Sequence, residues 1–447
     1  MDNDYKNPWE NENLKNPWGQ QQKVEDNKSF FKGMVIGVTI SLTLFIAILV
    51  GNILINKEYI ETDDNKQMLE NAGLDSEGST GEDETGATPE LNLDKVFNKA
   101  EYIKKLIDEY YYYEGDMANI EQGLYAGMVA ALGDPYSVYY DKESFKAMME
   151  STVGTYCGIG VVVQQNMETM TISVVNPYKD CPGYEAGMRP GDIILGTDEV
   201  DFTGMDINEA VSYIRGEENT TVKIKVLRGE EELTFDVTRK VIDIQTVSYE
   251  LLEGNIAYIK IESFDEVTYG QFKEAMTNAK KDNCVGYIFD VRDNGGGLYD
   301  TVVDMLDDLL PKGKIVYTED KYGHKETEFS DEDCIDKPIA VLTNGNSASA
   351  SEIFAGAIQD YGTGKIIGTQ TFGKGIVQSI IPLGDGTAVK LTVSSYFTPN
   401  GRNIHGEGIT PDQVVELPEE KEAYENGYIK RECDTQLNEA VKYILGE

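Results

Sequence analysis

Ser349 occupies a position where a serine hydroxyl could act as a nucleophile. Three consecutive patterns predict a buried strand, a small-residue turn and an amphipathic helix, over residues 337–343, 344–348 and 351–358. This order puts Ser349 at the N-terminus of the helix, where unpaired backbone N–H groups and the helix dipole stabilise negative charge. Serine is also a common helix cap, and Ser347 and Ser351 flank it, so the segment alone leaves capping and catalysis both open.

Lys374 is the candidate base for such a serine. The chain contains only two histidines, His324 and His405, which leaves few partners for a Ser-His pair. A lysine accepts a proton only when it is neutral, so its pKa must fall from about 10.4 to near 7. That change is worth about 4 to 5 kcal/mol, which apolar burial can supply. The neighbouring Phe372 and Ile376 fit that requirement, and His405 is retained as the alternative base.

Two glycine-containing segments need separate interpretations. Residues 289–297 (FDVRDNGGG) run from an apolar strand into three glycines, whose N–H groups could form an oxyanion hole or only a tight turn. Residues 368–374 match the first seven positions of a phosphate-binding P-loop. Gly375 stands where that motif needs serine or threonine, and a β-branched strand follows instead of a helix, so nucleotide binding is disfavoured.

Three motifs of the chain are 344–352 (NGNSASASE), 371–378 (TFGKGIVQ) and 290–297 (DVRDNGGG). Together they resemble the signatures of the carboxyl-terminal processing peptidases, the Ser-Lys serine protease family S41. The similarity extends over most of the chain from about residue 93 to the end. It implies that Ser349 is the nucleophile, that Lys374, 25 residues later, is the base, and that Gln378 orients the amine.

The resemblance also implies an oxyanion hole and no metal or cofactor. Its donors would be the N–H groups of Gly296 and Ala350. Gly295 stands where the family often has proline, which leaves the choice between Gly296 and Gly297 open.

Residues 151–240 are similar to a PDZ domain, and short strands separated by turns are predicted there. The segment 156–163 (YCGIGVVV) resembles the carboxylate-binding loop of such domains and the strand after it. PDZ domains add the C-terminal tail of a partner as an extra strand and hold its carboxylate with backbone N–H groups. The loop residues that the resemblance assigns to this role are Gly158, Ile159 and Gly160.

Residues 34–55 form an uncharged run of 22 residues, enough to span a hydrocarbon core about 30 Å thick. Lysines before the run and acidic residues after it predict a cytoplasmic N-terminus and an extracytoplasmic catalytic part. A cleavable signal peptide fits less well, because the run is long and lies more than 30 residues into the chain. The acidic, Gly/Ser/Thr-rich residues 56–92 are typical of a tether.

The expected architecture is a multidomain α+β chain. It comprises a disordered cytoplasmic segment (1–33), a transmembrane helix (34–55), an acidic linker (56–92), a helical domain (93–150), a PDZ β domain (151–240) and an α/β peptidase core of the ClpP/crotonase type with a C-terminal helix (241–447). The net charge of −40 argues against nucleic acid as a partner. Five scattered cysteines show no metal-binding spacing.

The expected function is a membrane-anchored, single-pass serine endopeptidase of the cell membrane. Its expected partners are proteins or peptides with accessible C-termini and a second copy of the chain in a homodimer. The alternative is a non-catalytic PDZ scaffold in which Ser349 only caps a helix.

Overall fold

The computed structural model describes residues 91–113, 117–425 and 428–447. The predicted cytoplasmic segment, the predicted span at 34–55 and nearly all of the linker therefore lie outside the described residues. Within the described part of the chain, none of the helices combines the length and the apolar character that a bilayer span requires.

The chain divides into two compact units, residues 1–117 and 118–447. In the first unit the structure describes helix α3 (Leu93–Tyr110). Asn92 caps it, because its side chain accepts the N–H of Lys95 at 2.9 Å. The helix expected from apolar spacing at the start of the helical domain is thus confirmed.

The second unit begins inside a helix, which is followed by a short strand and another helix. They are α4 (Met117–Ala130), β1 (Val138–Tyr140) and α5 (Lys142–Val153). Asp141 caps α5 by accepting the N–H of Ser144 at 2.7 Å, and Gly154 ends the helix with φ 74°. β1 pairs antiparallel with β17 (Ala388–Phe397), which connects this entry to the C-terminal region.

A small β domain follows, as the predicted short strands require. Its antiparallel sheet has the order β3-β4-β5-β6-β7. The strands are β3 (Val161–Gln165), β4 (Ile172–Pro177), β5 (Ile193–Thr197), β6 (Thr221–Arg228) and β7 (Glu231–Thr238). Also present are α6 (Pro182–Ala186), α7 (Ile207–Ile214) and the antiparallel pair β2 (Thr155–Gly158) and β8 (Lys240–Asp243). The domain has a hydrophobic core of its own, which includes Ile172, Ile224 and Val226.

An ion pair fastens two strands of this domain. The carboxylate of Asp192, just before β5, is fully buried and accepts bonds of 2.7 and 2.8 Å from the guanidinium of Arg228 on β6. It also accepts the N–H of Arg189 at 2.9 Å. Burial acts to raise the pKa of Asp192, but these bonds hold it below its ordinary value.

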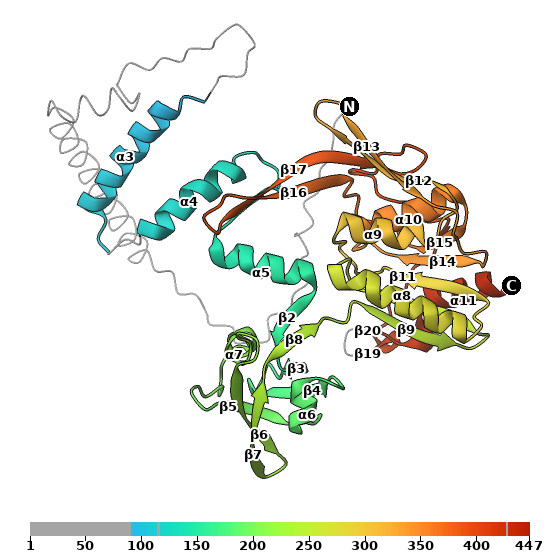
Figure 1. Cartoon of the computed structure of the whole chain (residues 1–447), viewed down its shortest axis with the longest axis horizontal. Helices are drawn as coiled ribbons and strands as arrows, with labels where there is room; N and C mark the ends of the chain where they lie inside the picture. The colour runs from blue at the N-terminus through green and yellow to red at the C-terminus, as the bar shows by residue number, and fades with distance from the viewer. Residues whose placement is uncertain (1–90, 114–116, 426–427) are drawn as a thin grey trace, which may run out of the picture. The chain divides into compact units, whose positions relative to one another are not determined.

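The C-terminal region is built on a mainly parallel sheet with the order β18-β15-β14-β11-β10-β9. Its strands are β9 (Val247–Leu252), β10 (Ile256–Ile261), β11 (Gly286–Asp290), β14 (Ile339–Thr343), β15 (Gly364–Gly368) and β18 (Gln413–Val414). Helices cover both faces of this sheet (Figure 1). One face carries α8 (Glu266–Lys281), α9 (Tyr299–Asp307) and α10 (Ala350–Tyr361), and the other carries α11 (Thr435–Leu445).

The central strands have uninterrupted apolar sequences because both of their faces are covered. Successive side chains of a strand point to opposite faces. Phe289 of β11 and Val341 of β14 belong to the core under α8, α9 and α10. Ile288 and Leu342, their neighbours in sequence, belong to the core under α11.

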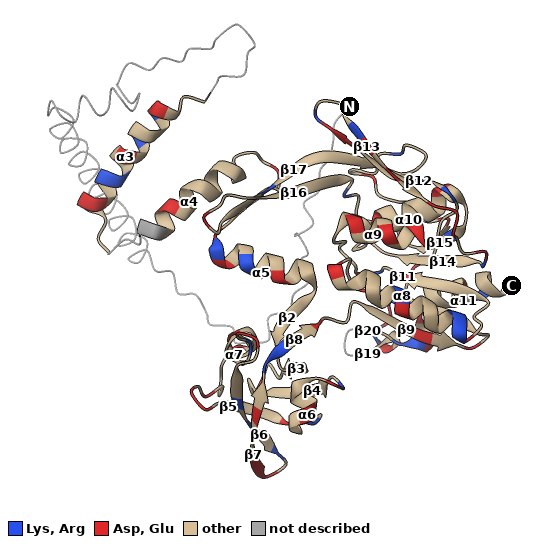
Figure 2. Ribbon diagram, in the orientation of Figure 1, with Lys and Arg blue, Asp and Glu red and all other residues tan. Residues whose placement is uncertain are grey.

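A second sheet has the order β1-β17-β12-β13, and β16 also pairs with β17. Its remaining strands are β12 (Gly313–Asp320), β13 (Lys325–Ser330) and β16 (Ile376–Pro382). The short elements near the C-terminus are η1 (Lys421–Ala423), β19 (Tyr424–Glu425), β20 (Tyr428–Ile429) and η2 (Arg431–Cys433). Acidic residues occur on most of the described helices, with basic residues dispersed among them (Figure 2). The mixed helix and sheet content agrees with the expected α+β class.

Candidate active site

Three neighbouring parallel strands bring the predicted site residues to one edge of the sheet. β14 pairs with β11 on one side and with β15 on the other, all in parallel. The carboxyl ends of parallel strands lie at the same edge, where the connecting loops gather. The glycine loop follows β11, Ser349 follows β14, and Lys374 follows β15. Segments that are far apart in sequence therefore leave the sheet side by side.

Ser349 differs from the two serines beside it. The hydroxyl of Ser347 is buried and donates to the carbonyl of Val291 at 2.8 Å, and that of Ser351 donates to the carbonyl of Asn294 at 2.8 Å. These two serines fasten the turn to the loop after β11. Ser349 is the N-cap of α10 and has φ 55° and ψ −114°, a strained conformation that costs on the order of 1 to 3 kcal/mol in a residue other than glycine.

A cavity of about 450 Å³ contains both members of the predicted dyad. Its lining includes Ser349, Lys374 and Gln378, the glycines Gly295 and Gly297, and Ala350. Met148 and Thr152 of α5 line it as well, so the helical entry contributes to its wall. The cavity offers the space that a substrate backbone would need beside the serine.

Glu352 connects the serine turn to the lysine loop. Its side chain is fully buried. One carboxylate oxygen, Oε2, accepts the N–H of Ser349 at 2.9 Å and the N–H of Lys374 at 2.8 Å. The other, Oε1, accepts the hydroxyl of Thr371 at 2.6 Å and the N–H of Gly373 at 2.8 Å. A single carboxylate thus fixes the backbone of both predicted catalytic residues.

Tyr396 makes a second connection from β17. Its ring is buried, and its hydroxyl lies 2.8 Å from the carbonyl oxygen of Lys374 and 3.0 Å from that of Ser349. A hydroxyl has one proton, so the two carbonyls share it. Ser349 and Lys374 are therefore held together through both the N–H groups and the carbonyl groups of their backbones.

The amine of Lys374 lies against an aromatic ring. Its Nζ is 4.8 Å from the centroid of the Tyr136 ring. Burial lowers the pKa of Lys374, and the positive charge of Lys390 lowers it further. Asp134 and Glu352 act in the opposite direction. In the described part of the chain, no hydrogen bond joins this amine to Ser349 or to Gln378.

Gln378 lies in the same cavity but has other contacts. A β-bulge separates it from Val377 in the pairing of β16 with β17. Its amide nitrogen is 3.4 Å from the carbonyl of Ile376 and 3.5 Å from the hydroxyl of Thr392. The role of Gln378 in orienting Lys374 remains a prediction.

The glycine loop packs closely against the serine. Gly296 has φ 107°, and a Cβ built on it would lie 2.8 Å from the Cβ of Ser349 and 3.0 Å from the backbone nitrogen of Ala350. Its N–H, however, donates to the side chain of Asn294 at 2.9 Å. Gly297 lines the cavity. The two predicted oxyanion donors, Gly296 and Ala350, are brought together, and which N–H groups serve a substrate remains a prediction.

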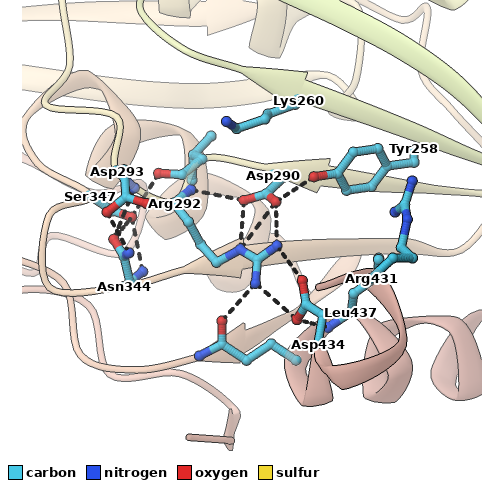
Figure 3. Close-up of polar contacts among 12 residues, drawn as sticks. Tyr258, Lys260, Asp290, Arg292, Asp293, Asn344, Ser347, Arg431, Asp434 and Leu437 are labelled. Atoms are coloured by element: carbon cyan, nitrogen blue, oxygen red, sulfur yellow. Dashed lines mark hydrogen bonds and ion pairs between the residues drawn. The ribbon is translucent and has the colours of Figure 1, made fainter. Parts of the chain in front are cut away.

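A buried ionic network holds the strand that leads into this loop (Figure 3). The Arg292 guanidinium is bound by both carboxylate oxygens of Asp290, at 2.6 to 3.1 Å, and by those of Asp434, at 2.9 and 3.0 Å. Asp434 also caps α11, and the hydroxyl of Tyr258 donates to Asp290 at 2.7 Å. The C-terminal helix is thereby attached to the base of the glycine loop.

The predicted carboxylate-binding loop of the β domain lines a separate groove of about 300 Å³. Gly158, Ile159 and Gly160 lie on its wall with the apolar residues Val163, Ile194, Val211 and Ile214. Gly160 has φ 68°, and the carbonyls of Ile159 and Gly160 accept the N–H groups of Gly183 and Tyr178. The site is suited to an apolar chain end, and its carboxylate contacts remain a prediction.

The alternative base His405 does not share the cavity. Among the described residues that line it, there is no histidine. The backbone of His405 packs on Gly375, where an added Cβ would lie 2.6 Å from its nitrogen. The other histidine, His324, is exposed and bonds to Asp320 at 3.0 Å.

Three residues of the site were not identified from the sequence. Glu352 had a visible signal, since Ser349-Ala-Ser-Glu352 has the spacing of a capping box. Tyr136 and Tyr396 carried none, because Tyr136 lies more than 200 residues before Lys374 in a turn bound to β17, and Tyr396 reaches the site only through the pairing of β17 with β16.

Comparison with known proteins identifies the family of this chain. The model of peptidase family S41 matches residues 255–415, a PDZ domain model matches 173–228, and the model of the activating protease CtpB N-terminal domain matches 48–144. A carboxy-terminal-processing protease of Bartonella bacilliformis is 39% identical over 362 residues, which cover 72% of this chain and 82% of that protein. The chain belongs to peptidase family S41.

One further relative and one solved structure are also similar to this chain. A probable CtpA-like serine protease of Staphylococcus aureus is 36% identical over 335 residues, covering 74% of this chain and 66% of that protein. The solved structure of the photosystem II D1 C-terminal processing protease has 28% identity and a TM-score of 0.43, over 73% of this chain and 91% of that one. The matches to the S41 and PDZ models and to the Bartonella protein confirm the expected classification as a serine-type peptidase with a PDZ domain.

Proposed function

We propose that this S41 peptidase is a membrane-anchored endopeptidase that captures protein C-termini with its PDZ domain and cleaves with a Ser349–Lys374 dyad. The observation that carries the proposal is the shared carboxylate of Glu352, which accepts the N–H groups of both residues while both line one cavity. A serine that served only as a helix cap would need neither the strained backbone nor the adjacent lysine.

The reaction would follow the acyl-enzyme route. Neutral Lys374 removes the hydroxyl proton of Ser349 as Oγ attacks the scissile carbonyl carbon. Backbone N–H groups of the glycine loop and of Ala350 stabilise the oxyanion. The lysine then gives its proton to the leaving amine as the C–N bond breaks. A water molecule, deprotonated in the same way, hydrolyses the ester and restores the free hydroxyl.

Removal of either dyad member tests the catalytic part. Ser349→Ala and Lys374→Ala should each abolish digestion of β-casein, an unfolded model substrate, while the melting temperature stays near that of the wild type. Ser151→Ala, in the same cavity, and Lys365→Ala, on the strand that leads to Lys374, are the matched controls and should retain digestion. Full activity of Ser349→Ala or of Lys374→Ala would end the assignment.

A covalent probe separates the protease from a non-catalytic PDZ scaffold. A β-lactone that acylates activated serines should modify Ser349, which mass spectrometry of the tryptic peptides locates. The label should be lost in Lys374→Ala and retained in Lys365→Ala. If the wild-type chain takes up no label yet binds C-terminal peptides, the scaffold alternative is favoured.

The PDZ groove accounts for tail capture. Its apolar lining suits an apolar side chain at the end of a peptide, and its loop supplies backbone N–H groups. A peptide that ends in Leu-Ala with a free carboxylate should bind at least about tenfold more tightly than the C-terminal amide of the same sequence. Equal affinities would exclude carboxylate recognition by the loop.

The membrane part of the proposal is supported by the sequence of residues 34–55 and by the lysine bias before them. Cys334, the exposed one of the five free cysteines, provides a test in intact cells. A membrane-impermeant maleimide should label it without lysis. In a Cys334→Ser background, a cysteine placed at Ser29 should be labelled only after lysis, and the reverse pattern would contradict the orientation.

A homodimer is the expected assembly, and the exposed apolar side chains of α4 support it. Leu124 and Met128 lie one helical turn apart and are 54% and 63% exposed. Sedimentation velocity should show a dimer that Met128→Glu dissociates. A monomeric wild-type chain at micromolar concentration would contradict this part.

A further inference from the structure

The contact between Lys374 and Tyr136 joins the proposed base to the turn before β1. The amine lies 4.8 Å from the ring centroid, which is within the range of a cation–π interaction. The ring itself is partly buried. In the described part of the chain, the amine has no hydrogen bond to the Ser349 hydroxyl, so this is not the geometry of proton transfer.

The turn that carries Tyr136 is firmly held. The carboxylate of Asp134 accepts the N–H of Tyr136 at 3.0 Å and the hydroxyl of Ser137 at 2.6 Å. It also accepts the hydroxyl of Thr392 on β17 at 2.6 Å, and the hydroxyl of Ser137 accepts the N–H of Thr392 at 3.1 Å. Because β17 also pairs with β16, which follows Lys374, the ring and the lysine are positioned by the same sheet.

Charged groups surround the amine on several elements. Lys390 of β17 lowers the pKa of Lys374, in the same direction as burial, whereas Asp134 of the turn and Glu352 of α10 raise it. The other titratable groups that line the cavity are Asp265, Tyr299, Asp300 and Tyr396. The carboxylates that favour the Lys374 ammonium are themselves titratable. The ring face of Tyr136, in contrast, can favour the ammonium without donating or accepting a proton.

We propose that the ring of Tyr136 is the resting place of the protonated Lys374 amine, which makes Tyr136 a positioning residue that sets the proton affinity of the base. The inference rests on the proposed Ser–Lys mechanism. The negative ring face attracts an ammonium and has little attraction for a neutral amine. Loss of the proton thus releases the amine from the ring, and only the competent, neutral form is free to reach the hydroxyl of Ser349.

The pH dependence of cleavage tests this role. In Tyr136→Leu the ammonium loses its partner, so the acid limb of kcat/KM against pH, measured on fluorescein-labelled β-casein, should move down by roughly 0.5 to 1.5 pH units. Tyr136→Phe keeps the ring and removes only the hydroxyl, so its acid limb should stay with that of the wild type. A structural role alone would lower kcat or the melting temperature and leave the limb in place.

A series of ring substitutions keeps the test valid if Tyr136→Leu does not fold. Phenylalanine, its 4-fluoro form and its 3,4,5-trifluoro form, introduced at position 136, weaken the ring quadrupole in steps while nearly preserving shape. The acid limb should move down in the same order, both for casein cleavage and for acylation of Ser349 by the β-lactone. An unchanged limb across the series would overturn the inference. If Lys374→Ala remained active, the proposed mechanism itself would fail instead.

Discussion

Replacement of Glu352 by glutamine removes one oxygen from the carboxylate that binds the backbones of Ser349 and Lys374. Oε2 accepts the N–H groups of Ser349 and Lys374 at 2.9 and 2.8 Å in a fully buried position. In the Glu352→Gln variant an amide NH₂ occupies one of the two oxygen positions, and it cannot accept. If the amide nitrogen replaces Oε2, two buried N–H groups lose their acceptor.

The cost follows from the number of lost bonds. A buried donor without a partner costs about 1 to 3 kcal/mol, so two of them cost roughly 2 to 6 kcal/mol. The opposite amide orientation leaves only the Gly373 N–H without an acceptor, because the Thr371 hydroxyl can turn and accept from the NH₂ group, so it costs about 1 to 3 kcal/mol. For a catalytic region of about 200 residues, a loss of about 1 to 6 kcal/mol corresponds to a fall in melting temperature of roughly 2 to 20 °C.

Activity should fall as well, because Glu352 no longer fixes the positions of the Ser349 hydroxyl and the Lys374 amine relative to each other. We expect kcat/KM for β-casein to fall at least about tenfold at a temperature where the Glu352→Gln variant is still folded, as near-UV circular dichroism would verify. Thr371→Val removes one donor to Oε1 and the acceptor of the Ile409 N–H but leaves both bonds to Oε2, so it is the graded control, with an expected loss of about 1 to 3 kcal/mol. If Glu352→Gln matched the wild type in melting temperature and in kcat/KM, the carboxylate would not hold the site together.

Three further predictions follow from the geometry. Tyr396→Phe removes the hydroxyl proton shared by the carbonyls of Ser349 and Lys374. The free energy of unfolding, measured in urea, should fall by about 1 to 2 kcal/mol, and casein cleavage should slow. Gly296→Ala would place a Cβ 2.8 Å from that of Ser349 at φ 107°, so cleavage should be lost while peptide binding by the PDZ domain persists. The folded-state pKa of Asp192 is lowered, so its ion pair contributes stability above the unfolded pKa of about 3.9. That stability is lost as the pH falls through the folded-state pKa. Asp192→Asn should therefore weaken the dependence of PDZ unfolding on acid pH.

Each of these three has a measurement that could contradict it. Tyr361→Phe, which removes a hydroxyl that donates to the carbonyl of Lys314, is the control for Tyr396→Phe, and equal effects on cleavage would deny Tyr396 a link to the site. Wild-type turnover by Gly296→Ala would show that the loop moves away from Ser349. For Asp192→Asn, an acid-unfolding curve parallel to that of the wild type would mean that the ion pair does not couple folding to pH.

The sequence by itself determined the local elements and the order of the motifs. β10 has the predicted bounds at residues 256–261, and α11 begins one residue after the predicted start at 434. These predictions succeed because periodicity and capping act over a few residues. The buried strand, turn and helix around Ser349 are of the same kind, and so is the strand after Lys374.

The tertiary structure decided which of these elements meet. The Arg292–Asp434 contact joins residues 142 positions apart, and the Asp134–Thr392 contact joins residues 258 apart. No local pattern encodes such partners, because each depends on which strands pair and which face a helix covers. Glu352 is an example, because a buried carboxylate needs hydrogen-bond donors. Its donors come from the turn of Ser349 and from the loop of Lys374, which only the tertiary structure brings together. The chemical groups were therefore visible in the sequence. The contact of Lys374 with the Tyr136 ring depended on β17, which binds the turn of Tyr136 and pairs with the strand after Lys374.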